Sequence, residues 1–274
     1  MAANGLAAAL FKVRPHVMLS VSTFFVDTNL LDQARASGTC VVLLHTEGPY
    51  ENERQLKLAP HADLNLLNDP TGIEHFEAIA PTVYAPHAYR PSVHCPGRSD
   101  EPFSDLVFVG TGYPSRMAFF EAMDLDGLTM ALAGNWMRLP DESKLRKMVV
   151  HDIDECFDNE DAVDLYRASR CGINLYRREA ENENLVAGWS VGPREVEMAA
   201  TGLFFLRDPR GEGDDLFPML PTFTGPEDAA EQLRWWLEHP DARGIAAMKA
   251  REAVADRTFQ HHAAKLLRLL GEKE

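Results

Sequence analysis

The 274-residue sequence has few cysteines and no long apolar run. Its four cysteines lie far apart and form no C-x-x-C pair, which argues against a disulfide framework. No apolar run approaches the roughly 20 residues that span a bilayer. The first residues, MAANGLAAALFKVRP, lack the basic region and the cleavage site of a secretory signal. We therefore expect a cytoplasmic protein with reduced thiols and no stable insertion into a membrane.

Basic residues are also fewer than acidic residues. The chain has 27 Lys and Arg against 42 Asp and Glu, and its formal net charge is −15. Affinity for nucleic acid depends largely on Lys and Arg that neutralise phosphates, so we expect no nucleic-acid partner. The apolar share of 45% is normal for a globular protein and allows a sizeable core.

Short apolar runs alternate with helical segments, a pattern typical of a parallel sheet covered by helices. Strands are expected at residues 16–22, 40–46, 63–69, 82–88, 105–110, 129–134, 171–176 and 202–207. Helices are expected at residues 27–37, 71–78, 114–123, 161–169 and 193–201, and again from residue 226 onward. The predicted fold class is α/β, with two Rossmann-like units.

A change of composition separates the two units. The segment RPSVHCPGRSDEPFS, which ends at Ser104, is rich in Pro, Gly and charge and has no periodicity. We therefore place the boundary near residue 100, between a domain of residues 1–100 and a domain of residues 101–274.

A glycine-containing turn follows the first strand of the second domain. Gly110-Thr111-Gly112 is followed by Pro114, which suits the first position of a helix, and by Arg116 in its first turn. Backbone N–H groups and a guanidinium at a helix N-terminus favour an anion, and a diphosphate fits there. A plain tight turn is the alternative interpretation.

The segment SVGPREVEMAATGLFFLRD predicts a helix that begins at Pro193 and ends at Gly202. Arg194 and Glu197 then lie one turn apart, so that a carboxylate and a guanidinium share one face. Such a carboxylate can accept hydrogen bonds from vicinal ribose hydroxyls. The alternative is an ordinary ion pair on the surface.

Together, FVGTGYPSR, ALAGNW, GINLYR and PREVEMAATGLFFL resemble the C-terminal domain of the CgeB-like, group-1 glycosyltransferases of GT-B fold. Upstream, LLHTEGPYE, LAPHADLNLLND and YAPHAYRPSVH resemble the later part of the N-terminal domain of the same enzymes. The resemblance implies two Rossmann-like domains that face a cleft. The first, acceptor domain is abbreviated, since only about a dozen residues precede RPHVMLSVSTFF, and the second binds a nucleotide sugar.

The resemblance also implies roles for residues of the donor site. Glu197 corresponds to the glutamate that binds the donor ribose, with Arg194 beside it. The residues that face the diphosphate would be Gly110, Thr111, Gly112 and Arg116. Asn135 and Trp136 would lie near the base, and Asn174 and Arg177 would line the cleft. Because Arg116 and helix amides can stabilise a leaving diphosphate, we expect no metal and no cofactor besides the donor substrate.

The acceptor side is marked by the strand CVVLLHT. His45 and Glu47 lie at its end, where either side chain could orient or deprotonate an acceptor hydroxyl. Both residues are equally compatible with a structural role. His87, in the segment that leads to the second domain, is a further candidate.

The predicted function is transfer of a hexose from a nucleotide diphosphate sugar to a hydroxyl of a protein, a glycan or a small molecule. The resemblance implies that the anomeric configuration is retained. One alternative is a degenerate binding or assembly module that has lost turnover with its first strands. Another is a nucleotide-sugar epimerase of GT-B fold.

Overall fold

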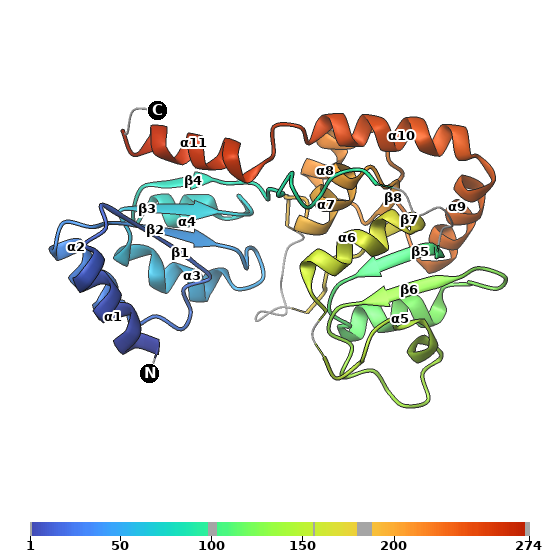
Figure 1. Ribbon diagram of the computed structural model, residues 1–274, viewed down its shortest axis with the longest axis horizontal. Coiled ribbons are helices and arrows are strands. Elements are labelled where there is room, and N and C mark those ends of the chain that lie inside the picture. Colours follow the sequence, from blue (N-terminus) through green and yellow to red (C-terminus); the bar gives the residue numbers. More distant parts are fainter. Residues whose placement is uncertain (1, 98–102, 156, 180–187, 272–274) are drawn as a thin grey trace. The chain divides into compact units, whose positions relative to one another are not determined.

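A computed structural model of the protein describes residues 2–97, 103–155, 157–179 and 188–271 (Figure 1). The chain forms two compact units. The first contains residues 1–86 and 180–190, and the second contains residues 87–179 and 191–274. The boundary expected near residue 100 falls inside the second unit of this division.

The first unit is built on a parallel sheet of four strands in the order β1-β2-β3-β4 (Figure 1). In its register, Leu43 pairs with Ser20 of β1 and with Asn65 of β3. Each strand follows its neighbour in sequence, so right-handed crossovers place the connecting helices on one face. The described elements are α1 (Ala2–Val13), β1 (Val17–Val21), α2 (Thr28–Ala36), β2 (Cys40–His45), α3 (Asn52–Leu58), η1 (Ala59–His61), β3 (Leu64–Leu67), α4 (Ile73–Glu77) and β4 (Thr82–Tyr84).

The second unit also has a parallel sheet of four strands, in the order β6-β5-β7-β8. Its described strands and short helices are β5 (Ser104–Val109), β6 (Met130–Ala133), η2 (Lys144–Met148), β7 (Ser169–Asn174) and β8 (Phe205–Arg207). Its described α-helices are α5 (Pro114–Ala122), α6 (Asn159–Arg167), α7 (Pro193–Thr201), α8 (Gly211–Leu216), α9 (Pro226–Glu238), α10 (Pro240–Ala253) and α11 (Phe259–Leu269).

The strand order of the second unit creates a topological switch point. From β5 the chain moves to β6 on one side, and it then crosses to β7 and β8 on the other side. Right-handed crossovers therefore place helices on both faces of the sheet. Accordingly, α5 packs with α9, whereas α7 packs with both α6 and α10. Ligands of such sheets bind beyond the carboxyl ends of the strands at the switch point, here between β5 and β7.

Local sequence explains where the elements of the second unit form. All four residues of β6 are buried, as expected for an apolar run in a parallel sheet that is covered on both faces. Pro114 and Pro193 occupy the first turns of α5 and α7. Gly202, with φ of 83°, ends α7 in the left-handed conformation that glycine tolerates. The predicted bounds of α7 are confirmed.

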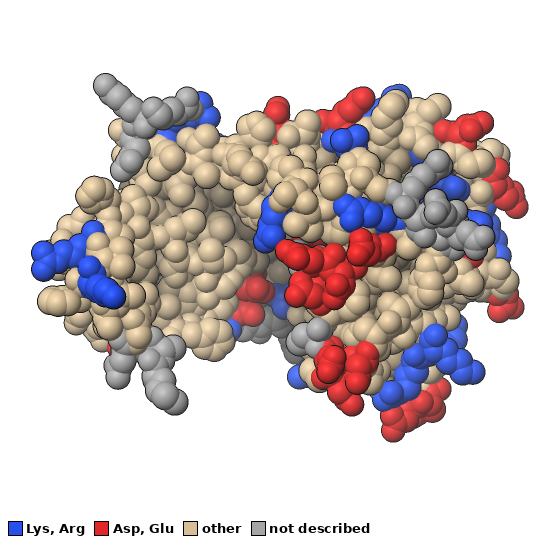
Figure 2. Space-filling view, in the orientation of Figure 1, with Lys and Arg blue, Asp and Glu red and all other residues tan. Residues whose placement is uncertain are grey.

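The surface of the second unit carries part of the excess negative charge. Acidic side chains gather over α6 (Figure 2), whose residues Glu160, Asp161 and Asp164 are exposed. Asp158 precedes the helix, and its side chain accepts a hydrogen bond from the N–H of Glu160 at 3.0 Å. Carboxylates at a helix N-terminus are favoured by the helix dipole, so this acidic end stabilises α6.

The predicted α/β fold class, with two Rossmann-like units, is confirmed. Three α-helices of the structure, α1, α3 and α8, were not predicted from the sequence. Cys40, Cys95 and Cys171 are free thiols, and Cys156 lies outside the described residues. Among the described helices, none combines the length and the apolar character needed to cross a membrane.

Candidate functional site

Arg116 joins the loops that follow β5 and β7 at the switch point of the second unit. Its Nε and Nη2 donate to the carbonyl oxygen of Leu175 at 2.9 and 2.6 Å, and its Nη1 donates to that of Thr111 at 3.0 Å. The guanidinium also lies 5.3 Å from the centroid of the Tyr113 ring. Arg116 therefore brings positive charge to the carboxyl ends of the strands, where the sequence analysis predicted it.

Trp136 packs against the glycine turn that follows β5. Its side chain is completely buried, and its Nε1 donates to the carbonyl oxygen of Ala133 at 3.2 Å. The Gly112 N–H donates to the carbonyl oxygen of Asn135 at 2.8 Å, and the side-chain oxygen of Asn135 accepts the N–H of Met137 at 3.4 Å. The segment after β6 thus holds the turn after β5, and Trp136 belongs to the core in this structure.

The N-terminus of α5 holds an anionic side chain. Glu179 accepts hydrogen bonds from the backbone N–H of Ser115 at 2.8 Å and from its hydroxyl at 3.0 Å. Burial raises the pKa of Glu179, but these hydrogen bonds outweigh it and leave the pKa below its ordinary value. This helix end therefore binds a carboxylate at the position where the sequence analysis predicted a diphosphate.

The other predicted residues after β7 also lie at the strand ends. Asn174 is the last residue of β7 and is buried; its Nδ2 has no hydrogen-bond partner among the described residues. Arg177 donates from Nη1 to the hydroxyl of Tyr113 at 3.2 Å, and its guanidinium lies 5.6 Å from the centroid of that ring. The turn after β5 and the segment after β7 are thus in direct contact.

Asp208 was missed by the sequence analysis. This buried residue follows β8, accepts the N–H of Tyr176 at 3.1 Å, and receives Arg178 Nη2 at 2.8 Å on each carboxylate oxygen. Its position directly after the predicted strand GLFFLR was the available signal, because polar residues at the carboxyl ends of parallel strands converge on one edge. Arg178 is thereby held beside Arg177 at the edge that carries the switch point.

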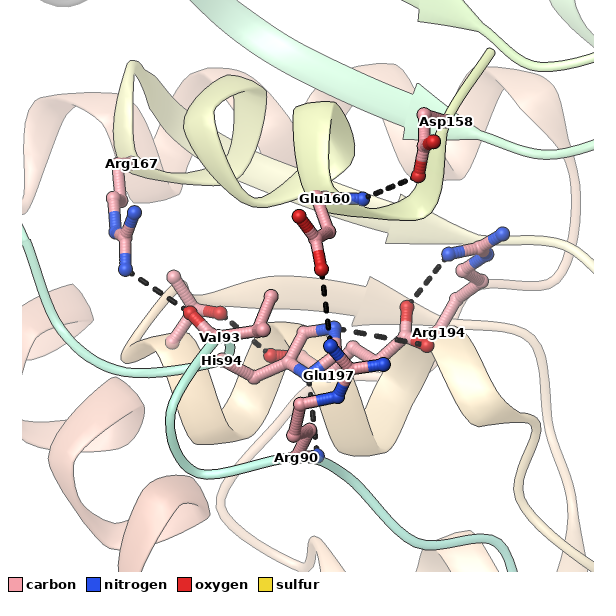
Figure 3. A network of polar contacts seen from close by, with 9 residues as sticks. Arg90, Val93, His94, Asp158, Glu160, Arg167, Arg194 and Glu197 are labelled. Carbon is pink, nitrogen blue, oxygen red and sulfur yellow. Dashed lines mark hydrogen bonds and ion pairs between the residues drawn. The ribbon is translucent and has the colours of Figure 1, made fainter. Parts of the chain in front are cut away.

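Arg194 and Glu197 form the ion pair expected on α7. Arg194 Nη1 lies 2.7 Å from Glu197 Oε2, and the side chains are 32% and 8% exposed. The glutamate is buried, so the pair is not an ordinary surface contact. His94 Nε2, from the segment before β5, lies 3.9 Å from the other oxygen of the carboxylate, Oε1 (Figure 3).

A second carboxylate, Glu195, caps the N-terminus of α7. Its Oε2 accepts the N–H of Gly192 at 2.7 Å and the hydroxyl of Tyr176, and the side chain is completely buried. Burial raises the pKa of Glu195 to about 7, although the bonds from Tyr176 and Gly192 oppose this shift. The Arg210 guanidinium lies 3.9 Å from the centroid of the Tyr176 ring. This capping role was also missed, because the sequence analysis considered only Arg194 and Glu197 on this helix.

His45 and Glu47 lie in the first unit. His45 is buried, and its Nε2 lies 2.8 Å from Asn65 Oδ1. Burial lowers the pKa of His45, which favours a neutral imidazole at neutral pH. The Glu47 N–H donates to Gln55 Oε1 at 3.1 Å, and its side chain is half-buried. His87, the further candidate, belongs to the second unit.

Three arginine side chains bring positive charge to the strand ends of the second unit. Arg116, Arg177 and Arg178 all contact the segments that follow β5, β7 or β8. Over the described ranges, no group of three or more His, Cys, Asp and Glu residues is placed to hold a metal ion. Chemically, this edge is suited to binding an anion such as a diphosphate.

Comparisons with known proteins agree with this architecture. A family model described as "Glycosyl transferase-like" matches residues 116–268, which is more than half of the chain. No curated protein matches the sequence.

Similar solved structures include a sucrose-phosphate synthase from Thermosynechococcus elongatus, with a TM-score of 0.66 and 13% identity over 98% of this chain and 76% of that one. HepE from Anabaena, in complex with UDP, has a TM-score of 0.64 and 12% identity over 97% of this chain and 82% of that one. Trehalose-6-phosphate synthase OtsA has a TM-score of 0.63 and 11% identity over 100% and 76%. At these identities the likeness shows the fold. The matched region contains most of α5, all of α7 and the residues Arg116, Arg177 and Arg178. The chain belongs to the glycosyl transferase-like family, with a GT-B fold.

Proposed function

We propose that the protein transfers a hexose from a nucleoside diphosphate sugar to an acceptor hydroxyl, with retention of the anomeric configuration and without a metal. The glycosyl transferase-like family and the GT-B fold support the transfer of a sugar. HepE, a structural neighbour, has been solved in complex with UDP and with UDP-glucose, which makes a uridine nucleotide the first donor to test. Membership of the CgeB-like branch is part of this proposal.

In this proposal the second unit binds the donor. The diphosphate lies at the N-terminus of α5, beside Gly110, Thr111, Gly112 and Arg116, and Arg177 contributes further positive charge. The ribose hydroxyls bind Glu197, with Arg194 beside it. Asn135 and Asn174 line the edge of the site toward the base. Negative charge that develops on the leaving diphosphate is stabilised by guanidinium groups and helix amides.

The observation that carries this proposal is the contact between Glu179 and Ser115. A helix N-terminus offers unpaired N–H groups and a positive dipole end, and the α5 terminus already accommodates an anionic group there. A donor diphosphate carries the same sign of charge and more acceptor oxygens. It can therefore replace the Glu179 carboxylate with stronger hydrogen bonds.

The acceptor site is proposed in the first unit. His45 and Glu47 follow β2, and the half-buried carboxylate of Glu47 is the better placed of the two for proton transfer, because His45 is buried against Asn65. The acceptor is a hydroxyl of a protein, a glycan or a small molecule. A Glu47→Gln variant that keeps donor affinity but loses transfer would support a role for this carboxylate.

A thermal-shift screen against UDP-, GDP-, ADP- and dTDP-sugars tests donor binding. A ligand that binds only the folded state raises the melting temperature, so we expect one donor class to stabilise the wild-type protein. Glu197→Ala should abolish this shift, whereas Glu231→Ala, on α9, should leave it intact. No shift with any donor would contradict the proposal. Binding without transfer or hydrolysis of the sugar would instead favour a degenerate binding module.

Retention and metal independence need a product assay. With the donor identified by the screen, proton NMR of the product reports the anomeric configuration. Transfer should proceed in the presence of EDTA at the same rate as in its absence. Inversion, or complete loss of transfer with the chelator, would contradict these two parts of the proposal.

A further inference from the structure

His94 presents an unsatisfied N–H to the carboxylate of Glu197. The backbone N–H of Arg90 donates to His94 Nδ1 at 3.3 Å, so Nδ1 acts as the acceptor. Burial lowers the pKa of His94, although the negative charge of Glu197 opposes this, and the imidazole is therefore neutral at neutral pH. A neutral imidazole that accepts at Nδ1 carries its proton on Nε2.

The Nε2–H group has no hydrogen-bond partner among the described residues, although the His94 side chain is only 5% exposed. It faces Glu197 Oε1 at 3.9 Å, which exceeds the distance of a hydrogen bond. Buried donors of this kind are rare in folded proteins, because an unpaired N–H loses its bond to water without gaining another. The arrangement suits a group that lies beside both atoms and forms a hydrogen bond with each.

A single hydroxyl group meets this requirement. Its oxygen can accept from an N–H and donate to a carboxylate at the same time, and a position about 3 Å from both atoms is compatible with their separation. Arg194 holds the other carboxylate oxygen at 2.7 Å and so keeps Oε1 turned toward His94. An ammonium ion offers no such pairing, since it has no atom that can accept from His94.

The backbone around His94 is tied to α6 from both sides (Figure 3). Arg167 Nη2 donates to the carbonyl oxygen of Val93 at 3.1 Å. Arg90 pairs with Glu160 at 3.0 Å, but both of these side chains are largely exposed, so this contact stabilises the segment little. The Arg90 side is held by backbone hydrogen bonds: the Arg90 carbonyl oxygen accepts the N–H of His94 at 2.8 Å, and the Tyr89 N–H donates to the carbonyl oxygen of Arg257 at 2.9 Å. The imidazole is thus fixed by the backbone on both sides.

We infer that His94 is a further donor-binding residue, whose Nε2–H donates to a ribose hydroxyl that in turn donates to Glu197. This inference rests on the proposed function, since it concerns the same ribose. Residues Arg90 to His94 then belong to the donor site, although they precede β5 in the sequence. The ligand class is a ribonucleoside diphosphate, and the recognised group is one of its two ribose hydroxyls.

Calorimetric titrations with UDP, 2′-deoxy-UDP and 3′-deoxy-UDP test the inference, with GDP or ADP and their deoxy forms used if the screen selects another base. The wild-type protein should bind the ribonucleotide about tenfold more tightly than one of its deoxy forms. His94→Asn keeps an acceptor near Nδ1 but removes the donor at Nε2. The variant should bind UDP about tenfold more weakly than the wild type does. Its affinity for the deoxy form that lacks the recognised hydroxyl should change little.

His94→Gln places an amide N–H near the position of Nε2 and should keep most of the affinity for UDP. His75→Asn, at an exposed histidine of the first unit, is the matched control and should bind all three nucleotides like the wild type. Circular dichroism verifies that each variant is folded.

If His94→Asn loses the same factor of affinity for UDP and for both deoxy forms, the histidine has only a structural role. That result would overturn the inference, while the proposed function would stand. Equal wild-type affinities for all three nucleotides would overturn it as well, whether or not the variant folds. A wild-type protein that binds no nucleoside diphosphate at all would overturn both proposals.

Discussion

Gly112 and Trp136 are in such close contact that a side chain at position 112 would force one of them to shift. A Cβ atom on Gly112 would lie 2.5 Å from the Trp136 ring, which is itself completely buried. The indole also packs against Phe108, with ring centroids 6.0 Å apart, so a movement of the ring would disturb the core. The turn after β5 is therefore held against the segment after β6.

Gly112→Ala should destabilise the second unit by about 1–3 kcal/mol through overpacking, and should weaken donor binding by displacing the turn. Gly244→Ala is the matched control. Gly244 lies inside α10 with open space around its Cβ position, so alanine should stabilise the protein there by about 0.5–1 kcal/mol. Urea unfolding measures both changes. A neutral Gly112→Ala variant would show that the indole can move.

Glu179 competes with any anion for the N-terminus of α5. Glu179→Gln removes the negative charge but keeps a side chain that can accept from Ser115, so a nucleoside diphosphate should bind about two- to fivefold more tightly. Glu121→Gln, elsewhere on α5, is the control and should leave affinity unchanged. Weaker binding in Glu179→Gln would indicate that the carboxylate organises the site rather than occupying it. Calorimetry distinguishes the two.

Glu195 should make stability depend on pH. Its pKa is about 7 in the folded protein against an ordinary value of 4.5, so the folded state holds this proton more tightly than the unfolded state. The resulting stabilisation is fully present below pH 4.5 and is lost as the pH rises to about 7. It amounts to about 3 kcal/mol at most.

Urea unfolding of wild type and Glu195→Gln at a series of pH values measures this effect. The difference between their free energies of unfolding should change mainly between pH 4.5 and 7. Glu160→Gln, at an exposed glutamate of α6, controls for the loss of one carboxylate. Parallel curves for wild type and Glu195→Gln would contradict the assignment.

Asp69 holds a segment of the first unit that is distant in sequence. Its Oδ2 accepts the N–H groups of Trp189 and Ser190, both at 2.9 Å, and its Oδ1 accepts that of Thr71 at 2.8 Å. Asp69→Ala should cost about 2 kcal/mol, because the buried N–H of Ser190 loses its acceptor. Amide hydrogen exchange at Trp189 and Ser190 should accelerate in the variant. Asp32→Ala, at an exposed aspartate, should change neither quantity.

The sequence predicted those parts of the site that depend on local order. Apolar runs gave the strands of the second unit, because a parallel sheet covered on both faces needs buried residues throughout. Pro193 and Gly202 gave the bounds of α7, since each acts on its own backbone. The spacing of Arg194 and Glu197 gave their ion pair, because residues three apart on a helix are neighbours.

What the sequence by itself determined about this protein is its α/β class, the positions of most strands and the pairs of residues within one turn of a helix. Only the tertiary structure decided which distant groups meet. Glu179 reaches Ser115 across 64 residues, Ser190 reaches Asp69 across 121, and His94 meets Glu197 from a segment with no periodicity of its own. Such contacts depend on strand order and on the packing of helices against the sheet, and no local pattern encodes these.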